Sequence, residues 1–423
     1  MKKNFNLKNI KLTKVKGILK WLYPGIGIKR WIGLSTFGIL LVIAGSLSLR
    51  TEEYWFVQLL DAIVVVSGII ILILGIKRMM HSFIIAVIPS SKGTELVDIL
   101  YQKKQLGRGP KIVAVGGGTG LSVLLSGLKE YTSNITAIVT VADDGGSSGR
   151  LRQQFDILPP GDIRNCLVAL ADASTLMRDL FQFRFDQSSE LSGHNFGNLF
   201  ITVMTRLTGD FEKAIKETSK VLALRGQVIP STLNNVALVA QHKDGTTTEG
   251  EDRIPKAHLP IDKVYLKAKG ASCATPEAIK AIEEAQIIIL GPGSLYTSII
   301  PNLLIEEITD SIVTSGAIKI YACNAMTQPG ETDGYSASDH IKALIRHSHA
   351  RILDYCILNI GEISKDALKR YAQEDAYPVV NDTKKIESMG YRIIEDDIII
   401  AKDVVRHDPL KLAKVIISFI EEV

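Results

Sequence analysis

Two glycine-rich stretches and a pair of aspartates are the residues of this chain best suited to chemistry. Residues 116–120 read Gly-Gly-Gly-Thr-Gly and follow the apolar segment Lys111 to Val115. Glycine lets a ligand approach the backbone, and a helix beginning near Leu121 would offer unpaired N–H groups and its positive dipole end to an anion. The run therefore predicts a phosphate cradle, with a tight turn that binds nothing as the alternative.

Asp143 and Asp144 come directly after the next apolar segment, Ile135 to Val141. Proteins hold Mg²⁺ with one or two carboxylates together with phosphate oxygens, so this pair is a candidate metal site and the candidate catalytic pair. The alternative is that one aspartate caps the turn that follows. Arg150 and Arg152 lie close in sequence and would either neutralise phosphate or remain solvated.

A second glycine loop, Gly291-Pro292-Gly293-Ser294-Leu295-Tyr296-Thr297-Ser298, follows the apolar segment Ala285 to Leu290. Its glycines free the backbone, and its hydroxyl groups stand at an expected helix start. Two such loops at neighbouring strand ends could clasp a diphosphate from both sides. Neither established signature is present: the third glycine of GxGxxG would fall at Leu121, and no GK[ST] occurs after either loop.

Three further groups of polar residues follow predicted strands or open predicted helices. Asp162 is expected to be the N-cap of a helix whose first turn carries Arg164 and Asn165, with ligand and structural roles equally open. In GHNFGN, His194 is an acid–base candidate but more typical of a structural histidine. The stretch from Asn324 to Thr332 suits recognition of a sugar or base edge, or is a capped turn.

The elements that must position these residues alternate between short apolar strands and helices. Five Val- and Ile-rich runs are expected as strands buried on both faces: Lys111 to Val115, Ile135 to Val141, Ala285 to Leu290, Ile318 to Cys323 and Tyr355 to Leu358. This predicts a doubly wound α/β sheet that is mainly parallel. A helical insertion over 176–220 and a β-rich insertion over 236–268 are expected between the second and third runs.

Two long uncharged segments precede this domain, Trp31 to Leu49 and Ala62 to Ile76, the second reaching spanning length with Trp55 to Asp61. They predict a two-helix transmembrane hairpin, with a buried helical hairpin as the alternative. Cations flank both outer ends, so the positive-inside rule places both termini and the main domain in the cytoplasm of a two-pass inner-membrane protein. The predicted order is a basic arm (1–30), the hairpin (31–80, with its apolar part ending at 76), a linker (81–110) and one domain (111–423).

Charge and cysteine usage restrict the partners. The chain carries a formal net charge of +4, yet its first 30 residues contain nine Lys and Arg and no acid, which leaves −5 on the rest. A mildly acidic main domain argues against nucleic acid as a partner, and the basic arm suits anionic lipid. The four cysteines show no CxxC spacing and are expected to be reduced core thiols.

The motifs GGGTGLSVLLSGLK, TVADDGGSSGRLR, LPPGDIRNCLVALAD, GHNFGN, GPGSLYTSIIPNLL and CNAMTQPGETDGYSASDH occur in this order from about residue 111 to beyond 340. In these motifs the chain strongly resembles the gluconeogenesis factor (YvcK-like) family, relatives of the CofD-like 2-phospho-L-lactate transferases. The glycine-histidine-serine run usual in the family reads GHN here, which puts a ligand role for Asn195 in question. The membrane hairpin is an addition that the simplest members lack.

The resemblance implies a Rossmann-like fold that binds a UDP-sugar, such as UDP-N-acetylglucosamine, in support of cell shape and wall synthesis during gluconeogenic growth. It also implies a homo-oligomer such as a dimer and a partner in cell-envelope synthesis. The ligand-binding candidates, including those that the resemblance carries onto this chain, are Gly117, Gly118, Thr119, Gly120, Arg150, Arg164, Asn195, Asn198, Gly291, Pro292, Gly293, Ser294, Tyr296, Thr297, Asn324, Thr327 and Gln328.

Three functions remain at this point. The first is a membrane-tethered UDP-sugar sensor without turnover. The second is a transferase of a phosphate-linked group from a nucleoside diphosphate donor, with Mg²⁺ at Asp143 and Asp144 stabilising developing charge. An NAD-dependent oxidoreductase is the least favoured, because the third glycine of its fingerprint and an acid placed to hold the ribose are missing.

Overall fold

The computed structural model describes residues 28–51, 54–87, 104–186, 190–268, 270–401 and 404–422. The chain divides into two compact units, 1–103 and 104–423, which are considered separately below. The second unit begins at Lys104, a few residues before the start predicted at 111. The predicted basic arm lies almost wholly outside the described residues, as do positions 88–103 of the predicted linker.

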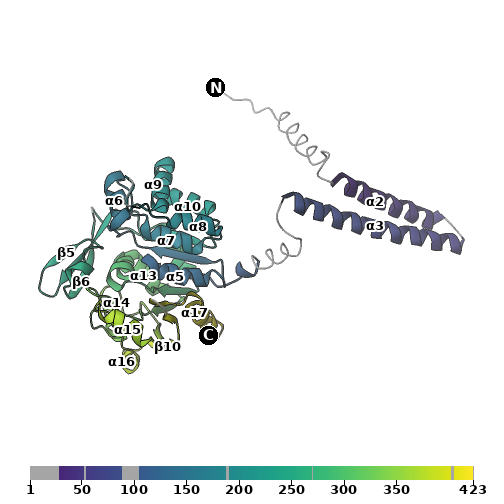
Figure 1. Cartoon of the computed structure of the whole chain (residues 1–423). Helices are drawn as coiled ribbons and strands as arrows, with labels where there is room; N and C mark the ends of the chain where they lie inside the picture. The colour runs from purple at the N-terminus through teal and green to yellow at the C-terminus, as the bar shows by residue number, and fades with distance from the viewer. Residues whose placement is uncertain are drawn as a thin grey trace. The chain divides into compact units, whose positions relative to one another are not determined.

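The first unit is a helical hairpin of α2 (Ile28–Thr51) and α3 (Trp55–Val87) (Figure 1). Glycines bring the two helices close: a Cβ on Gly38 would lie 2.8 Å from the carbonyl oxygen of Gly68, and one on Gly68 would lie 2.9 Å from that of Gly38. Small residues allow such close backbone approach between apolar helices. By length and composition alone, the segments Arg30–Leu49 and Trp55–Ser82 could each cross a membrane.

The second unit is built on a seven-stranded sheet in which every described strand pair is parallel, which confirms the predicted α/β class. The strand order is β10-β9-β8-β7-β1-β2-β3. The strands are β1 (Ile112–Gly116), β2 (Ile135–Val139), β3 (Gln227–Pro230), β7 (Ile287–Leu290), β8 (Ile318–Ala322), β9 (Tyr355–Asn359) and β10 (Arg392–Asp396). The order reverses at β1, so the crevice beyond the carboxyl ends of β1 and β7 is a topological switch point, where open α/β sheets bind ligands.

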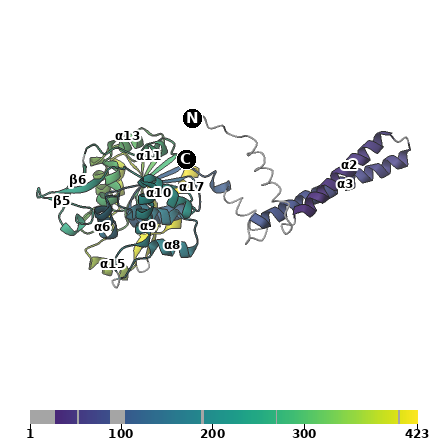
Figure 2. The same cartoon turned by 90° about the horizontal axis from the view of Figure 1, so that it is seen from above.

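The five predicted strands are present within two residues of their expected bounds, and four of them, β1, β2, β7 and β8, are buried along almost their whole length. The edge strands β3 and β10 were not predicted. Helices surround the sheet in both views (Figures 1 and 2). They are α5 (Gly118–Leu128), α6 (Gly146–Phe155), α7 (Gly161–Leu170), α8 (Thr175–Gln182), α9 (Phe196–Thr208), α10 (Phe211–Val221), α11 (Pro276–Glu283), α12 (Ile300–Leu303), α13 (Glu306–Thr314), α14 (Ala337–Arg346), α15 (Lys365–Ala372), α16 (Thr383–Ser388) and α17 (Pro409–Glu422).

The two insertions lie between β2 and β7, as predicted. Helices α8, α9 and α10 form the helical insertion, and β3 separates it from the β-rich one. The β-rich insertion is an antiparallel sheet of β4 (Val236–His242), β5 (Thr247–Glu249) and β6 (Ile261–Ala268), which projects from one side of the unit in both views (Figures 1 and 2). The short helix η1 (Pro255–Ala257) connects β5 and β6, and β11 (Ile399–Ala401) pairs with β12 (Val405–His407) before α17.

Candidate functional site

The two glycine loops touch each other at the switch point. The first follows β1 and opens α5 at Gly118, whose φ of +63° lies in the left-handed region that glycine favours. A Cβ on Gly120 would lie 2.6 Å from the carbonyl oxygen of Pro292 and 2.8 Å from Cα of Gly293. Because these are backbone atoms, position 120 accepts only glycine without displacing the second loop. The loops predicted to face a common ligand are therefore in direct contact.

A buried asparagine, Asn302 of α12, holds both loops. Its Nδ2 donates to the carbonyl oxygens of Gly116 (3.1 Å) and Ser298 (2.8 Å), and its side chain is fully buried. The segment between the second loop and α12 is the π-helix η2 (Leu295–Ile299). Sequence reasoning missed Asn302, although an amide in the apolar run IIPNLL is the signal that could have found it.

Amides from the end of β8 support the second loop from the other side. Asn324 Nδ2 donates to the carbonyl oxygen of Gly293 (2.8 Å), and Gln328 Nε2 donates to Oγ of Ser294 (2.7 Å). Thr327 instead bonds through its hydroxyl and its N–H to the backbone of Tyr377. The structure thus places Asn324 and Gln328 against the loop, while Thr327 fastens the neighbouring chain segment.

Carboxylates collect on the β2 side of the crevice. Asp143 Oδ1 accepts the N–H of Gly145 (2.9 Å), so this aspartate does make the turn contact that was the alternative to a ligand role. Asp144 Oδ1 accepts the N–H of Asp252 (3.0 Å), which brings the segment after β5 onto the site. Among the described residues, no group of three or more His, Cys, Asp or Glu is arranged to hold a metal ion.

The prediction that Asp162 is a helix N-cap is wrong. Helix α7 begins at Gly161, two residues earlier than predicted, with Pro160 at the N-cap position and no side-chain cap. The carboxylate of Asp162 instead accepts the N–H of Gly118. It also lies close to Gly117, because a Cβ built on Gly117 would be only 2.5 Å from Oδ2 of Asp162. Burial, with repulsion from Asp143, raises the pKa of Asp162 to about 7. This residue therefore belongs to the first glycine loop's surroundings and not to the helix cap.

Two glutamates lie in the same part of the domain, Glu331 from the stretch predicted to recognise a sugar or base edge and Glu251, which sequence reasoning did not single out. Glu331 is 6% exposed, its Oε1 accepts from Thr297 Oγ1 (3.1 Å), and burial raises its pKa to about 7. Burial, with the charges of Asp143 and Asp162, raises the pKa of Glu251 to about 9. Glu251 feels the charges of Asp143, Asp162 and Glu331, whereas Glu331 itself bonds the second glycine loop. The two glutamates come from loops distant in the sequence, so only the folded chain brings them together.

The polar residues before α9 bond to one another and to α6. Asn195 caps α9 by accepting the N–H of Asn198, and it donates to the carbonyl oxygen of Gln182. His194 pairs with Oγ of Ser147 (3.2 Å), and Arg150 donates to the carbonyl oxygen of Ser192 (3.0 Å). These contacts hold Asn195, His194 and Arg150 in place between α6 and the start of α9.

Four buried side-chain atoms near the crevice have no hydrogen-bond partner in the described part of the chain. They are Nε of Arg164, Oδ1 of Asn198, Oδ1 of Asn302 and Oε2 of Glu331. Asn198 Nδ2 donates to Ser148 (3.4 Å), whose hydroxyl also bonds Asp143, so the amide is next to the carboxylates. Buried polar groups are almost always paired in folded proteins, so such atoms mark places where a ligand or water would complete the bonding.

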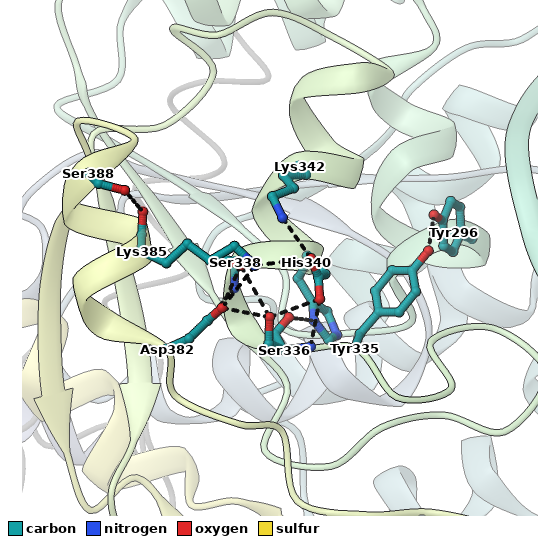
Figure 3. A network of polar contacts seen from close by, with 10 residues as sticks. Tyr296, Tyr335, Ser336, Ser338, His340, Lys342, Asp382, Lys385 and Ser388 are labelled. Atoms are coloured by element: carbon teal, nitrogen blue, oxygen red, sulfur yellow. Dashed lines mark hydrogen bonds and ion pairs between the residues drawn. The ribbon is translucent and has the colours of Figure 1, made fainter.

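Tyr296 connects the second loop to a polar network at the start of α14. Its hydroxyl bonds that of Tyr335 (2.8 Å), and the neighbouring Ser336 and Ser338 both donate to Asp382 (Figure 3). This network fixes the segment before α16 against α14. Tyr296 is itself buried, so its position supports a bracing role for the hydroxyl.

Comparison with known proteins agrees with this architecture. The family model for 2-phospho-L-lactate transferase CofD matches residues 112–399. A putative gluconeogenesis factor from Nostoc sp. is 47% identical, over 96% of this chain and 93% of its own length. The gluconeogenesis factor of Bacillus subtilis is 48% identical, over 75% of this chain and 100% of its own length. The chain belongs to the gluconeogenesis factor family.

A crystal structure of a protein from Bacillus halodurans shows the same fold for the main domain. It is 48% identical to this chain, has a TM-score of 0.71, and covers 73% of this chain and 99% of its own. The Bacillus halodurans and Bacillus subtilis relatives align over nearly their whole length with only about three quarters of this chain, roughly the share of the main domain. The alignment with the Nostoc protein covers 96% of this chain, so it extends into the segment that forms α2 and α3 here.

Proposed function

We propose that this member of the gluconeogenesis factor family is a membrane-tethered protein that binds a UDP-sugar, such as UDP-N-acetylglucosamine, without turning it over. The observation that carries the proposal is the direct contact of two glycine loops at the switch point of the sheet, at Gly120 and Pro292. Asp162 accepts the N–H of Gly118, but the following N–H groups in the first turn of α5 and the glycine-containing second loop suit a diphosphate. Support of cell shape and wall synthesis during gluconeogenic growth is the role we assign to it.

The acidic side of the crevice suits the hydroxyl groups of the sugar. A protonated carboxyl group can both donate and accept hydrogen bonds. Asp162 and Glu331 have pKa values of about 7, so each is partly protonated near neutral pH. The unpartnered amide oxygen of Asn198 offers a further acceptor. The helices α2 and α3 would anchor this domain at the inner membrane on its cytoplasmic side, with a homo-oligomer and a cell-envelope partner as further proposals.

The second candidate, a Mg²⁺-dependent transferase, is favoured by the pair Asp143 and Asp144. Asp143 accepts from the N–H of Gly145 and from the hydroxyl of Ser148, and Asp144 accepts from the N–H of Asp252. Each carboxylate keeps lone pairs that a cation shared with phosphate oxygens would use. Bound Mg²⁺ would supply stabilisation of charge on a leaving diphosphate. The protein's own residues would hold the diphosphate on the glycine loops and orient the phosphate-linked group on the carboxylate side.

Calorimetry on the full-length chain in detergent separates the two candidates. A sensor binds UDP-N-acetylglucosamine with equal affinity with and without Mg²⁺, outcompetes GDP and NAD, and retains binding when Asp144→Asn is introduced. A transferase prefers GDP in the presence of Mg²⁺ and loses both binding and turnover in the same variant. If no nucleoside diphosphate binds under either condition, the proposal is wrong.

A further inference from the structure

A cavity lies beside the glycine loops, at the carboxyl ends of β8 and β9. Its volume is about 230 Å³, and its lining contains three asparagines, Asn324, Asn359 and Asn381, together with apolar side chains and no charged residue. Pockets that enclose a whole small-molecule ligand are larger, roughly 300–1,000 Å³. The size therefore fits one moiety of a ligand, and the lining fits a flat, uncharged one.

Hydrogen bonds fix how two of these amides are oriented. The Nδ2 of Asn324 donates to the carbonyl oxygen of Gly293 (2.8 Å), and that of Asn381 donates to the carbonyl oxygen of Asn359 (2.8 Å). A carbonyl oxygen can only accept, so each amide must direct its NH₂ group there. No described residue donates to Oδ1 of Asn324 or of Asn381, whereas the side chain of Asn359 is fully engaged by Gly361 and Ile398.

The wall that carries Asn381 is held firmly. The next residue, Asp382, accepts from the N–H and hydroxyl of Ser338 (2.8 and 2.6 Å) and from the hydroxyl of Ser336 (Figure 3). On the other side, the N–H of Val379 donates to the carbonyl oxygen of Ala325 (3.1 Å). The cavity is therefore preformed, which lowers the ordering cost of binding.

We propose that this cavity receives the base of the nucleoside diphosphate, and that the free amide oxygens of Asn324 and Asn381 select a base with a ring N–H. Uracil and guanine carry such a donor on their pairing edge, whereas cytosine and adenine present an acceptor nitrogen there. Asn324 contacts the second glycine loop and also lines the cavity, so a diphosphate on the loops continues into the cavity through its ribose. The inference rests on the proposed function.

Placing the base in this cavity also sets which end of the ligand lies over which strands. The base lies over β8 and β9, the diphosphate over β7 and β1, and the phosphate-linked sugar on the side of β2, where Asp143, Asp144 and Asp162 lie. This arrangement keeps the uncharged base away from the carboxylates and gives the sugar hydroxyls polar partners.

The test compares UDP, GDP, CDP, ADP and inorganic pyrophosphate by calorimetry on the full-length chain in detergent. We expect UDP and GDP to bind about tenfold more tightly than CDP and ADP, the effect of one hydrogen bond satisfied or opposed. Asn381→Ala should remove this preference and leave pyrophosphate affinity unchanged. Asn134→Ala is the matched control. The Asn134 amide also donates to backbone carbonyl oxygens, but it lies just before β2, at the amino ends of the strands and not at the carboxyl ends where the cavity lies.

Equal affinity of the wild-type chain for all four nucleotides overturns the base pocket, and so does a preference that survives Asn381→Ala. Both outcomes leave the proposed function standing, because the diphosphate still binds. If neither the nucleotides nor pyrophosphate bind, the proposed function fails and the pocket assignment fails with it.

Discussion

Replacing Gly120 by alanine tests the contact on which the site depends. The added Cβ would lie 2.6 Å from the carbonyl oxygen of Pro292 and 2.8 Å from Cα of Gly293, whereas ordinary contacts begin near 3.4 Å. The two loops must therefore separate by roughly 0.8 Å, the difference between those contact distances. Inserting one carbon into a closely packed region costs about 1–3 kcal/mol.

The same displacement should weaken ligand binding. Groups that hold a ligand in a preorganised site lose much of their effect when they move by about 1 Å, so we expect affinity for UDP-N-acetylglucosamine to fall at least tenfold. Calorimetry measures the affinity, and urea unfolding of the same full-length chain in detergent measures the stability.

Gly316→Ala is the matched control, since a Cβ there meets nothing within 4 Å and its φ is not in the left-handed region. It reports the gain in stability that comes from restricting the unfolded chain. If Gly120→Ala binds ligand as the wild type does and unfolds at the same urea concentration as Gly316→Ala, the two loops do not meet in solution.

Two other predictions concern a buried carboxyl group and the helical hairpin. Glu331 has its pKa raised by burial from 4.5 to about 7, so the folded state keeps a proton that the unfolded chain releases, and stability should fall by about 3 kcal/mol as pH rises from about 4 to 8. Asp162 and Glu251, whose pKa values are also raised, add to this fall. Glu331→Gln should remove the share of about 3 kcal/mol due to Glu331 in urea unfolding at several pH values, while Glu283→Gln, at an exposed position of α11, should leave the dependence unchanged. Gly68→Val should lower the thermal stability of the hairpin in detergent, at a cost of roughly 1–3 kcal/mol, because its Cβ would lie 2.9 Å from the carbonyl oxygen of Gly38. Gly33→Val, where a Cβ meets nothing within 4 Å, should have little effect, and equal stability of both variants would contradict the packing of α2 against α3.

Sequence reasoning located the strands that carry the site because their signal is local. A continuous run such as Ile287–Leu290 is short and rich in β-branched residues, which favours a strand buried on both faces. Edge strands lack that signal: β10 reads Arg-Ile-Ile-Glu-Asp and is only partly buried, so its composition does not distinguish it from a loop. The glycine loops were also visible, since glycine next to a strand end limits the conformations and contacts that are possible there.

The sequence by itself determined the α/β class, the two glycine loops and their place at strand ends, and the apolar hairpin. Only the tertiary structure decided which polar groups meet. Asp162 binds Gly118 and not its own helix end, and Asn302 joins both loops. Glu251 arrives beside the aspartates, and Glu331 beside Thr297 of the second loop, from distant parts of the sequence. Secondary structure follows from patterns within about ten residues, whereas the partner of a buried side chain depends on strand order and on what other segments leave unsatisfied. The residues that decide these contacts are far apart in the sequence and come together only when the chain folds.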